Sequence, residues 1–194
     1  MFLETICIQQ GEVQNKPRHE ERMYRTASHF GFKSPALPDL LPLLPKKLRD
    51  TKVKCRIIYR ETIQELTFEP YLPRKIISLK LIEASPDYAF KLADRHTLND
   101  LLEKKGDCDE ILITRNGFIT DTSYSNVVLR RGDTYFTPET PLLNGTKRQK
   151  LLQEGRITEK QIHRDSLQTY DRVYLINAML NMEDGISLPA HNIV

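Results

Sequence analysis

A lysine and an acid thirty positions further along form the most informative chemical pair in this chain. Lys91 lies within residues 88–95, and Asp121 follows a hairpin turn that Asn116 and Gly117 predict. A lysine amine can form a Schiff base with an aldehyde, and a carboxylate can keep a pyridine nitrogen protonated. These are the two groups that a pyridoxal 5'-phosphate (PLP) enzyme requires, so the pair predicts PLP chemistry.

Each member of this pair also has an ordinary explanation. Most lysines are solvated, although Tyr88 and Phe90 could give Lys91 the apolar surround that lowers an amine pKa. Acids such as Asp121 are common beside turns for conformational reasons alone. A buried carboxylate needs a partner, however, and a pyridinium N–H would be a suitable one.

A possible phosphate site lies where a helix is predicted to begin. Gly145 is followed by Thr146 and Lys147, and then by a basic stretch. The N–H groups and the dipole at a helix N-terminus attract anions. The alternative is a helix end with a solvated basic face.

An arginine one helical turn after a histidine is a second possible phosphate ligand. Arg22 follows His19, and a guanidinium can bind a phosphate through two hydrogen bonds. The alternative is a surface ion pair with Glu20 or Glu21.

The composition favours a cytoplasmic soluble protein. The 194 residues suit one large domain or two small ones, and a net charge of +3 without a basic stripe argues against nucleic acid as a partner. We expect no membrane partner, because no apolar run approaches the roughly 20 residues that span a bilayer, and the first residues do not resemble a secretion signal. Three unpatterned cysteines favour a reducing compartment. The five histidines lack metal-ligand spacing, so no metal site is predicted.

The pattern of apolar residues predicts an α+β fold in two parts. Residues 1–84 would form a small α+β domain and residues 85–194 a larger cofactor-binding domain. The first part contains a strand at 3–9, a helix at 17–30, an alternating strand at 53–59, a strand around Leu66 and Phe68, and a strand at 77–81. The second contains a helix at 88–105, hairpins around 110–121 and 126–136, a helix at 146–153 and a strand at 173–176.

The order of these motifs resembles the class IV aminotransferase family, the fold-type IV PLP enzymes. That family includes branched-chain and D-amino acid aminotransferases and aminodeoxychorismate lyases. The stretch 3–6 is similar to its first strand, His19 and Arg22 to its phosphate-binding motif, and Lys91 to its Schiff-base lysine. Residues 121–126 resemble its acid-to-asparagine segment, and 137–148 its Thr-Pro and glycine loop.

The resemblance implies a fold-type IV architecture with mostly antiparallel sheets flanked by helices and a shortened small domain. It implies PLP as cofactor and a homodimer, with the cofactor at the junction of the two parts. The implied site residues are the catalytic Lys91 and a cofactor-binding set: Arg22, Lys91, Asp121, Asn126, Gly145, Thr146, Lys147, Asn177 and Ala178.

The segment Asn177-Ala178 looks most like the lyase branch, which favours pyruvate elimination from an aminodeoxychorismate-like amino substrate, a step on the 4-aminobenzoate and folate route. The alternatives are an amino acid transaminase and a degenerate, non-catalytic PLP-binding or scaffold protein. Two departures support the last alternative: Asp121 stands where the family normally has a glutamate, and the chain is short for the family. Cys7 also stands where aminotransferases often have an arginine.

Overall fold

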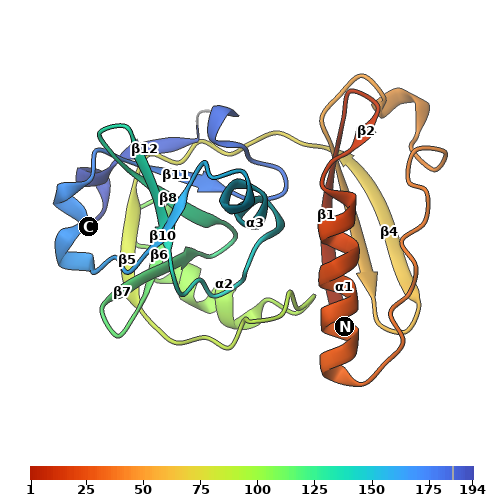
Figure 1. The fold of residues 1–194 in the computed structure, drawn as a ribbon, viewed down its shortest axis with the longest axis horizontal. Coiled ribbons are helices and arrows are strands. Elements are labelled where there is room, and N and C mark those ends of the chain that lie inside the picture. Colours follow the sequence, from red (N-terminus) through yellow and green to blue (C-terminus); the bar gives the residue numbers. More distant parts are fainter. Residues whose placement is uncertain (185) are drawn as a thin grey trace. The chain divides into compact units, whose positions relative to one another are not determined.

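The chain folds into two compact units, each with its own sheet. The computed structural model describes residues 1–184 and 186–194 (Figure 1). The first unit comprises residues 1–72 and 90–94, and the second comprises residues 73–89 and 95–194. The division therefore falls at residue 72, with a return at 90–94, whereas the sequence placed it near residue 84.

The first unit is a four-stranded antiparallel sheet with one long helix. The strands lie in the order β2-β1-β3-β4. The helix ends at Gly31, whose φ of 70° suits glycine because it has no Cβ. The elements are β1 (Phe2–Gln9), β2 (Glu12–Val13), α1 (Lys16–Phe30), the 3₁₀ helix η1 (Lys46–Leu48), β3 (Val53–Tyr59) and β4 (Ile63–Pro70).

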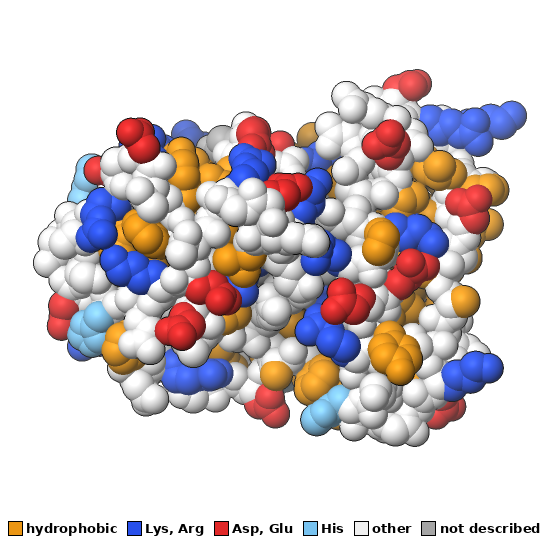
Figure 2. Space-filling model, viewed as in Figure 1, with side chains coloured by type: hydrophobic (Ala, Val, Ile, Leu, Met, Phe, Trp, Pro, Cys, Tyr) orange, Lys and Arg blue, Asp and Glu red, His pale blue; other side chains and the backbone are white. Residues whose placement is uncertain are grey.

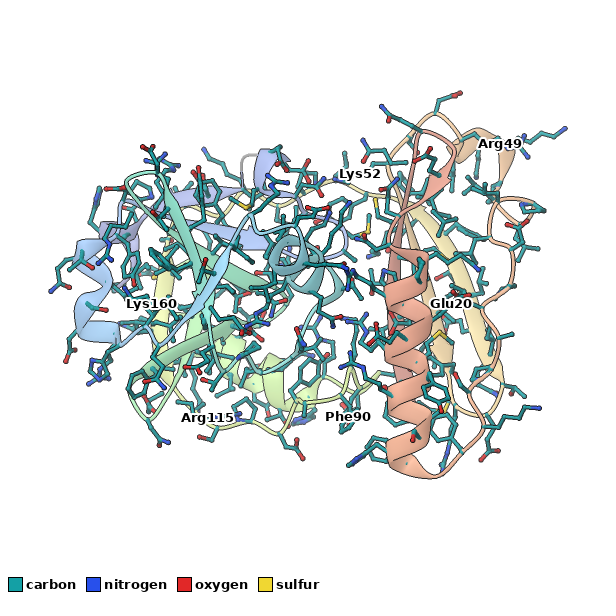
Figure 3. The ribbon with its side chains drawn as sticks, viewed as in Figure 1. Glu20, Arg49, Lys52, Phe90, Arg115 and Lys160 are labelled. Atoms are coloured by element: carbon teal, nitrogen blue, oxygen red, sulfur yellow. The ribbon has the colours of Figure 1, made fainter. Side chains whose placement is uncertain are left out.

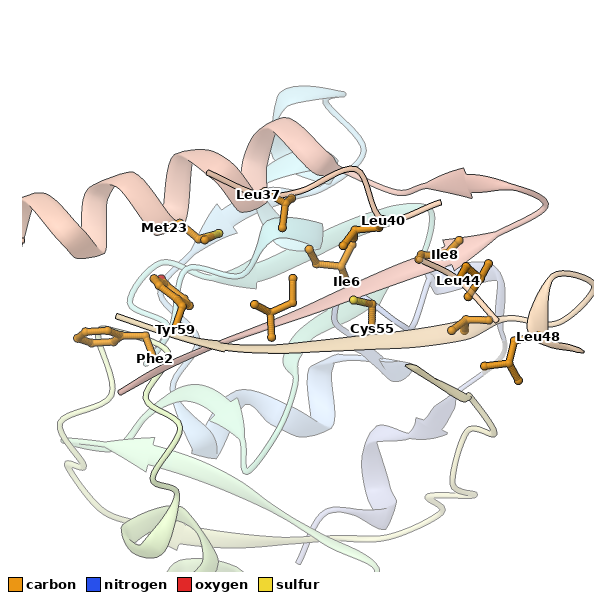
Figure 4. Close-up of a cluster of buried hydrophobic side chains, with 12 residues drawn as sticks. Phe2, Ile6, Ile8, Met23, Leu37, Leu40, Leu44, Leu48, Cys55 and Tyr59 are labelled. Atoms are coloured by element: carbon orange, nitrogen blue, oxygen red, sulfur yellow. The ribbon is translucent and has the colours of Figure 1, made fainter. Parts of the chain in front are cut away.

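Alternating side chains of β1 and β3 build the core of this unit. The buried side chains of β3 are Val53, Cys55, Ile57 and Tyr59, as the alternation in the sequence predicted. The proline-containing stretch after α1, which the sequence predicted to be irregular, supplies leucines to the same core (Figure 4). Removal of these apolar side chains from water is the main stabilising contribution to this unit.

The second unit is built on an eight-stranded mixed sheet. Its main path is β10-β9-β8-β7-β6-β5, and β11 pairs with both β8 and β12. The strands are β5 (Leu79–Glu83), β6 (Glu110–Arg115), β7 (Phe118–Thr122), β8 (Asn126–Arg131), β9 (Thr134–Pro138), β10 (Thr158–Lys160), β11 (Arg172–Ile176) and β12 (Ser187–Pro189). The helices are α2 (His96–Glu103), α3 (Thr146–Gln153) and the 3₁₀ helices η2 (Arg164–Thr169), η3 (Met182–Asp184) and η4 (Ala190–Asn192).

Most local predictions are confirmed. The helices α1 and α3 begin and end within one residue of the predicted ranges. Asn116 and Gly117 have φ values of 52° and 79°, which are those of a type I′ turn, and they join β6 to β7. The α+β class with mostly antiparallel sheets is confirmed.

Two local predictions are wrong. The helix predicted over residues 88–105 begins only at His96, because residues 90–94 return to the first unit and hydrogen-bond along β1. The strand predicted at 77–81 lies at Leu79–Glu83 and pairs in parallel with β6 of the second unit, not with the first sheet. In both cases the partner strand is distant in sequence, and it decided the outcome.

The surface charges and the helices of the described residues bear on the kinds of partner that the chain could bind. Within the described residues, no helix has the length and apolarity needed to cross a membrane. Lys and Arg side chains are scattered among Asp and Glu side chains on the face shown in Figure 2. The described residues also contain no cluster of His, Cys, Asp and Glu suited to a metal ion.

Candidate active site

Lys91 lies in a short segment that is tied to the first strand of the first unit. Its carbonyl accepts a hydrogen bond from the N–H of Leu3 at 2.9 Å, and Leu92 bridges to Phe2 in antiparallel fashion. The N–H of Leu92 also bonds to the carbonyl of Phe90 at 2.9 Å, so Lys91 is the central residue of a three-residue turn. The lysine backbone is therefore fixed on both sides.

Aromatic packing anchors the residue before Lys91. Phe90, labelled in Figure 3, stacks on His29 with ring centroids 4.4 Å apart and meets Phe30 edge-on at 5.0 Å. Leu92, on the other side, packs against the core of the first unit. Lys91 itself is half-buried.

Arg22 is held by a buried acid that the sequence analysis did not select. Its Nε and Nη2 donate to the two carboxylate oxygens of Glu4 at 2.7 and 2.5 Å, and His19 Nδ1 lies 2.6 Å from the same carboxylate. All three side chains are buried. The predicted alternative, a surface pair of Arg22 with Glu20 or Glu21, is wrong, because Arg22 is buried and pairs with Glu4.

This cluster stays charged although it is buried. Burial raises the pKa of Glu4, but the charge of Arg22 and hydrogen bonds from His19 and Arg22 outweigh burial and lower the pKa to about 2. Burial also lowers the pKa of His19, against the opposing effect of Glu4. A neutral His19 and an ionised Glu4 therefore orient the planar guanidinium of Arg22.

In the second unit, Asp121 is a buried carboxylate with both oxygens oriented. Oδ1 accepts a hydrogen bond from Asn126 Nδ2 at 2.8 Å, and Oδ2 accepts one from the N–H of Leu143 at 2.9 Å. Asn126 Nδ2 also donates to the carbonyl of Leu143 at 2.8 Å. Asp121 and Asn126 are the single residue pair that joins β7 to β8.

Asp121 is not fully compensated by these contacts. Burial raises its pKa to about 6, although hydrogen bonds from Leu143 and Asn126 and the charge of Arg148 act in the opposite direction. A buried acid of this kind would be stabilised in its ionised form by one further cationic donor.

Gly145 lies against the amide that holds Asp121. A Cβ built on Gly145 would come within 2.1 Å of Asn126 Oδ1, far below any real contact distance. The backbone of Gly145 has φ −69° and ψ 148°, which any residue can adopt. Glycine is therefore needed here for the close approach and not for its backbone freedom.

We expect Gly145→Ala to weaken the site by displacing Asn126 from Asp121. Loss of one hydrogen bond to a buried charged group corresponds to about a tenfold to hundredfold loss of cofactor affinity. Fluorescence or absorbance titration with PLP measures this loss. In an Asn126→Ala background the clash is absent, so Gly145→Ala should then have little further effect, and equal losses in both backgrounds would refute the explanation.

The first turn of α3 carries buried cations. Lys147 and Arg148 are both buried, and Lys147 Nζ hydrogen-bonds to Asn181 Oδ1. Arg148 bonds to the carbonyl of Pro138 at 2.8 Å and to Glu159 at 2.6 Å. The alternative of a solvated basic face is therefore wrong for this turn.

Gly145 caps α3 without a side chain that could accept from the first turn. The first N–H groups of a helix have no acceptor within the helix. Those of Thr146 and Lys147 are consequently suited to an anion, and the positive end of the helix dipole favours the same ligand. Thr146 is itself buried.

The segment at Asn177 and Ala178 forms a tight turn tied to the residues after Asp121. Asn177 Oδ1 accepts from the N–H groups of Met179 at 2.8 Å and Leu180 at 3.1 Å, and its Nδ2 donates to the carbonyl of Tyr124 at 3.4 Å. Ala178 lies at the tip of this turn and is half-buried.

The predicted residues of the second unit therefore belong to one connected network. Hydrogen bonds and close contacts run from Asp121 through Asn126 to the Gly145 loop, and from α3 through Lys147 to Asn181. The turn at Asn177, which precedes Asn181, then leads back to Tyr124. Arg22 and Lys91 belong to the first unit.

Glu4 and Arg148 are supporting residues that the sequence analysis missed. For Glu4 a signal was present, since it occupies a core-facing position in the alternation of β1. An acid in that position must have a buried partner. For Arg148 no signal was present, because the basic residues around it are typical of a solvated helix face.

Known proteins resemble this chain over most of its length. Residues 1–183 match the model of the family described as amino-transferase class IV. An uncharacterised protein of Haemophilus influenzae is 38% identical over 183 residues, which cover 92% of this chain and 97% of that protein. A Schizosaccharomyces pombe protein, provisionally named an aminodeoxychorismate lyase, is 25% identical and aligns with 91% of this chain and 85% of its own.

Solved structures give the same result. A crystal structure from Haemophilus somnus, provisionally named a 4-amino-4-deoxychorismate lyase, superposes with a TM-score of 0.79 at 35% identity and covers 92% of this chain and 95% of its own. A provisionally named amino-acid aminotransferase from Mesorhizobium loti has a TM-score of 0.81 at 23% identity, covering 100% and 99%, and it supports the fold alone. The fold-type IV architecture is confirmed, and the chain belongs to the class IV aminotransferase family.

Proposed function

We propose that this chain is a PLP-dependent enzyme that eliminates pyruvate from an aminodeoxychorismate-like substrate. The family is PLP-dependent, and a protein of the same fold from Mycobacterium tuberculosis is described in a PLP-bound form at 16% identity. The names given to the Haemophilus somnus and Schizosaccharomyces pombe proteins support the lyase branch. So does the segment that begins Asn177-Ala178.

The observation that carries the proposal is the state of Asp121. Its carboxylate is buried, both of its oxygens are oriented, and its pKa is raised to about 6. A protonated pyridine nitrogen would give it the cationic N–H donor that the surrounding residues do not fully replace. The Gly145 loop, which has no room for a Cβ, and the uncapped start of α3 fit the phosphate. The residues of the second unit therefore fit PLP.

The proposed roles follow from the chemistry of each side chain. When bound, PLP supplies an aldehyde carbon for amine attack and a ring that accepts electrons from the substrate. Lys91 would hold the cofactor through its Nζ, and its free amine would be the base that moves the proton of the substrate α-carbon. Asp121 would keep the ring nitrogen protonated, as the partner on the other side of the ring.

The remaining residues would bind and enclose the cofactor. Arg22, oriented by Glu4, and the N–H groups of Thr146 and Lys147 would hold the phosphate. Asn126 and Gly145 would fix Asp121, and the turn at Asn177 and Ala178 would close the site.

Pyruvate release distinguishes the lyase from its nearest alternative. We expect the PLP-loaded protein to release pyruvate and an aromatic amine from aminodeoxychorismate with no keto acid added. Coupling to lactate dehydrogenase measures the pyruvate directly. The Lys91→Ala variant is the control for uncatalysed breakdown.

The opposite result would support an amino acid transaminase. If amino-group exchange occurs only when a keto acid is present, the lyase assignment is refuted and the PLP assignment stands. The family name favours this second candidate. A colourless protein that cannot take up PLP would instead favour the non-catalytic scaffold.

The family resemblance also supports a cytoplasmic homodimer acting on a small-molecule amino substrate. Light scattering coupled to gel filtration tests the dimer. A monomer at micromolar concentration with full activity would contradict it.

A further inference from the structure

The backbone N–H and C=O of one residue near Asp121, Ser123, are both held by side chains outside the predicted site. The N–H of Ser123 donates to Glu110 Oε1 at 3.3 Å. The carbonyl of Ser123 accepts from Arg95 Nη2 at 2.6 Å. Ser123 lies in the short turn between Asp121 and Asn126, the residues whose pairing joins β7 to β8.

The turn itself is closed by a threonine. The N–H of Thr122 bonds to the carbonyl of Ser125 at 2.9 Å, and Thr122 Oγ1 accepts from the N–H groups of Tyr124 and Ser125 at 3.3 and 2.9 Å. Such side-chain to backbone bonds stabilise a tight turn. They fix its internal shape, but they do not attach it to the rest of the unit.

Asn177 Nδ2 attaches the turn through the Tyr124 carbonyl, and Glu110 adds a further attachment from the start of β6. Its side chain is fully buried, and Oε1 accepts from the N–H groups of Ile111 at 2.9 Å and Ser123 at 3.3 Å. Among the described residues, Oε2 has no hydrogen-bond partner although it is buried. Burying an acid with an unsatisfied oxygen costs free energy, so packing alone does not explain a glutamate at this position.

Arg95 makes another attachment from the residue before α2. Its Nη2 donates a short bond to the Ser123 carbonyl, while its Nε is buried and has no hydrogen-bond partner among the described residues. The carboxylate of Glu110 therefore accepts from the N–H of Ser123, and the guanidinium of Arg95 donates to its carbonyl.

We infer that Glu110 and Arg95 are positioning residues that clamp the 122–125 turn and so hold the Asp121 carboxylate at the proposed cofactor. This inference rests on the proposed function, because it assigns the clamp to the acid that would face the pyridine nitrogen. Arg148 of α3, Asn126 and the N–H of Leu143 also act on that acid. Glu110 and Arg95 act differently, because they fix the backbone of the turn that follows Asp121.

The test compares four variants by a measurement that needs no cofactor. The carboxyl carbon of Asp121 is titrated by ¹³C NMR in protein freed of PLP, with Asp121→Asn identifying its signal. In wild type the midpoint should lie near the pKa of about 6. Glu110→Ala and Arg95→Ala should lower the midpoint toward the ordinary range, because a loosened turn admits water.

The conservative variants separate positioning from simple loss of stability. Glu110→Gln keeps an acceptor oxygen for Ser123, and Arg95→Lys keeps one donor. Both should retain the wild-type midpoint and bind PLP within about twofold of wild type. The alanine variants should bind PLP about tenfold more weakly.

Several outcomes would overturn the clamp. An unchanged Asp121 midpoint in folded Glu110→Ala and Arg95→Ala would do so, as would a Glu110→Gln variant as defective as Glu110→Ala. If Glu110→Ala does not fold, the comparison of Arg95→Ala with Arg95→Lys decides. A wild type that never binds PLP would refute the proposed function, while the cofactor-free titration would still show whether Glu110 and Arg95 hold Asp121.

Discussion

Lys91→Ala will abolish the visible absorption band of the PLP-loaded protein and lower its activity on the order of 10⁴-fold or more. The band arises from the covalent bond between the lysine amine and the cofactor aldehyde, and alanine cannot form that bond. Borohydride reduction of the PLP-loaded wild type should attach the cofactor permanently to Lys91. Peptide mass spectrometry then identifies the modified lysine. The backbone around Lys91 is held by Leu3 and by its packed neighbours, so the variant should remain folded.

Lys104→Ala is the matched control for this experiment. Lys104 is exposed beyond the end of α2. The Lys104→Ala variant therefore removes a lysine side chain that lies outside the proposed site. It should keep both the band and the activity. A visible band that persists in Lys91→Ala, or a borohydride label on a different lysine, would refute the assignment of Lys91.

Asp121→Asn should lower the activity on the order of 10² to 10⁴-fold and yet stabilise the cofactor-free protein at neutral pH. The activity falls because a neutral amide cannot keep the pyridine nitrogen protonated. The stability rises because the variant no longer carries an ionised, buried carboxylate. Opposite signs for activity and stability are what a functional, locally unfavourable group produces.

The pH dependence of this effect follows from the raised pKa. In the folded state the pKa of Asp121 is about 6, above the ordinary value of 3.8. Its contribution is therefore fully present below pH 3.8 and is lost as the pH rises through 6. A shift of this size corresponds to about 3 kcal/mol as an upper estimate. Between pH 4 and pH 7.5, wild type should lose up to that much stability relative to Asp121→Asn.

Urea unfolding of both proteins without cofactor at the two pH values measures this difference. The carboxamide of Asp121→Asn has one hydrogen-bond acceptor fewer than the carboxylate. This loss changes the free energy of unfolding of the variant by the same amount at both pH values. Only the change between them reports on Asp121. A stability difference that does not vary with pH would contradict the buried, uncompensated state of this carboxylate.

The sequence by itself determined the elements whose patterns are local. The bounds of α1, the alternation of β3 and the Asn116-Gly117 turn follow from side-chain periodicity and turn chemistry. The order of the motifs around Lys91, Asp121 and Gly145 was enough to identify the family.

Only the tertiary structure decided what holds the candidate residues in place. Residues 90–94 are not helical, because their hydrogen-bond partners include residues of β1, at the other end of the first unit's sequence. The bidentate bonds of Arg22 to Glu4, the Cβ-excluding contact of Gly145 with Asn126 and the grip of Glu110 on Ser123 all join distant positions. Local periodicity specifies which face of an element is buried, but the partner on that face is chosen by packing and by the need to satisfy buried polar groups.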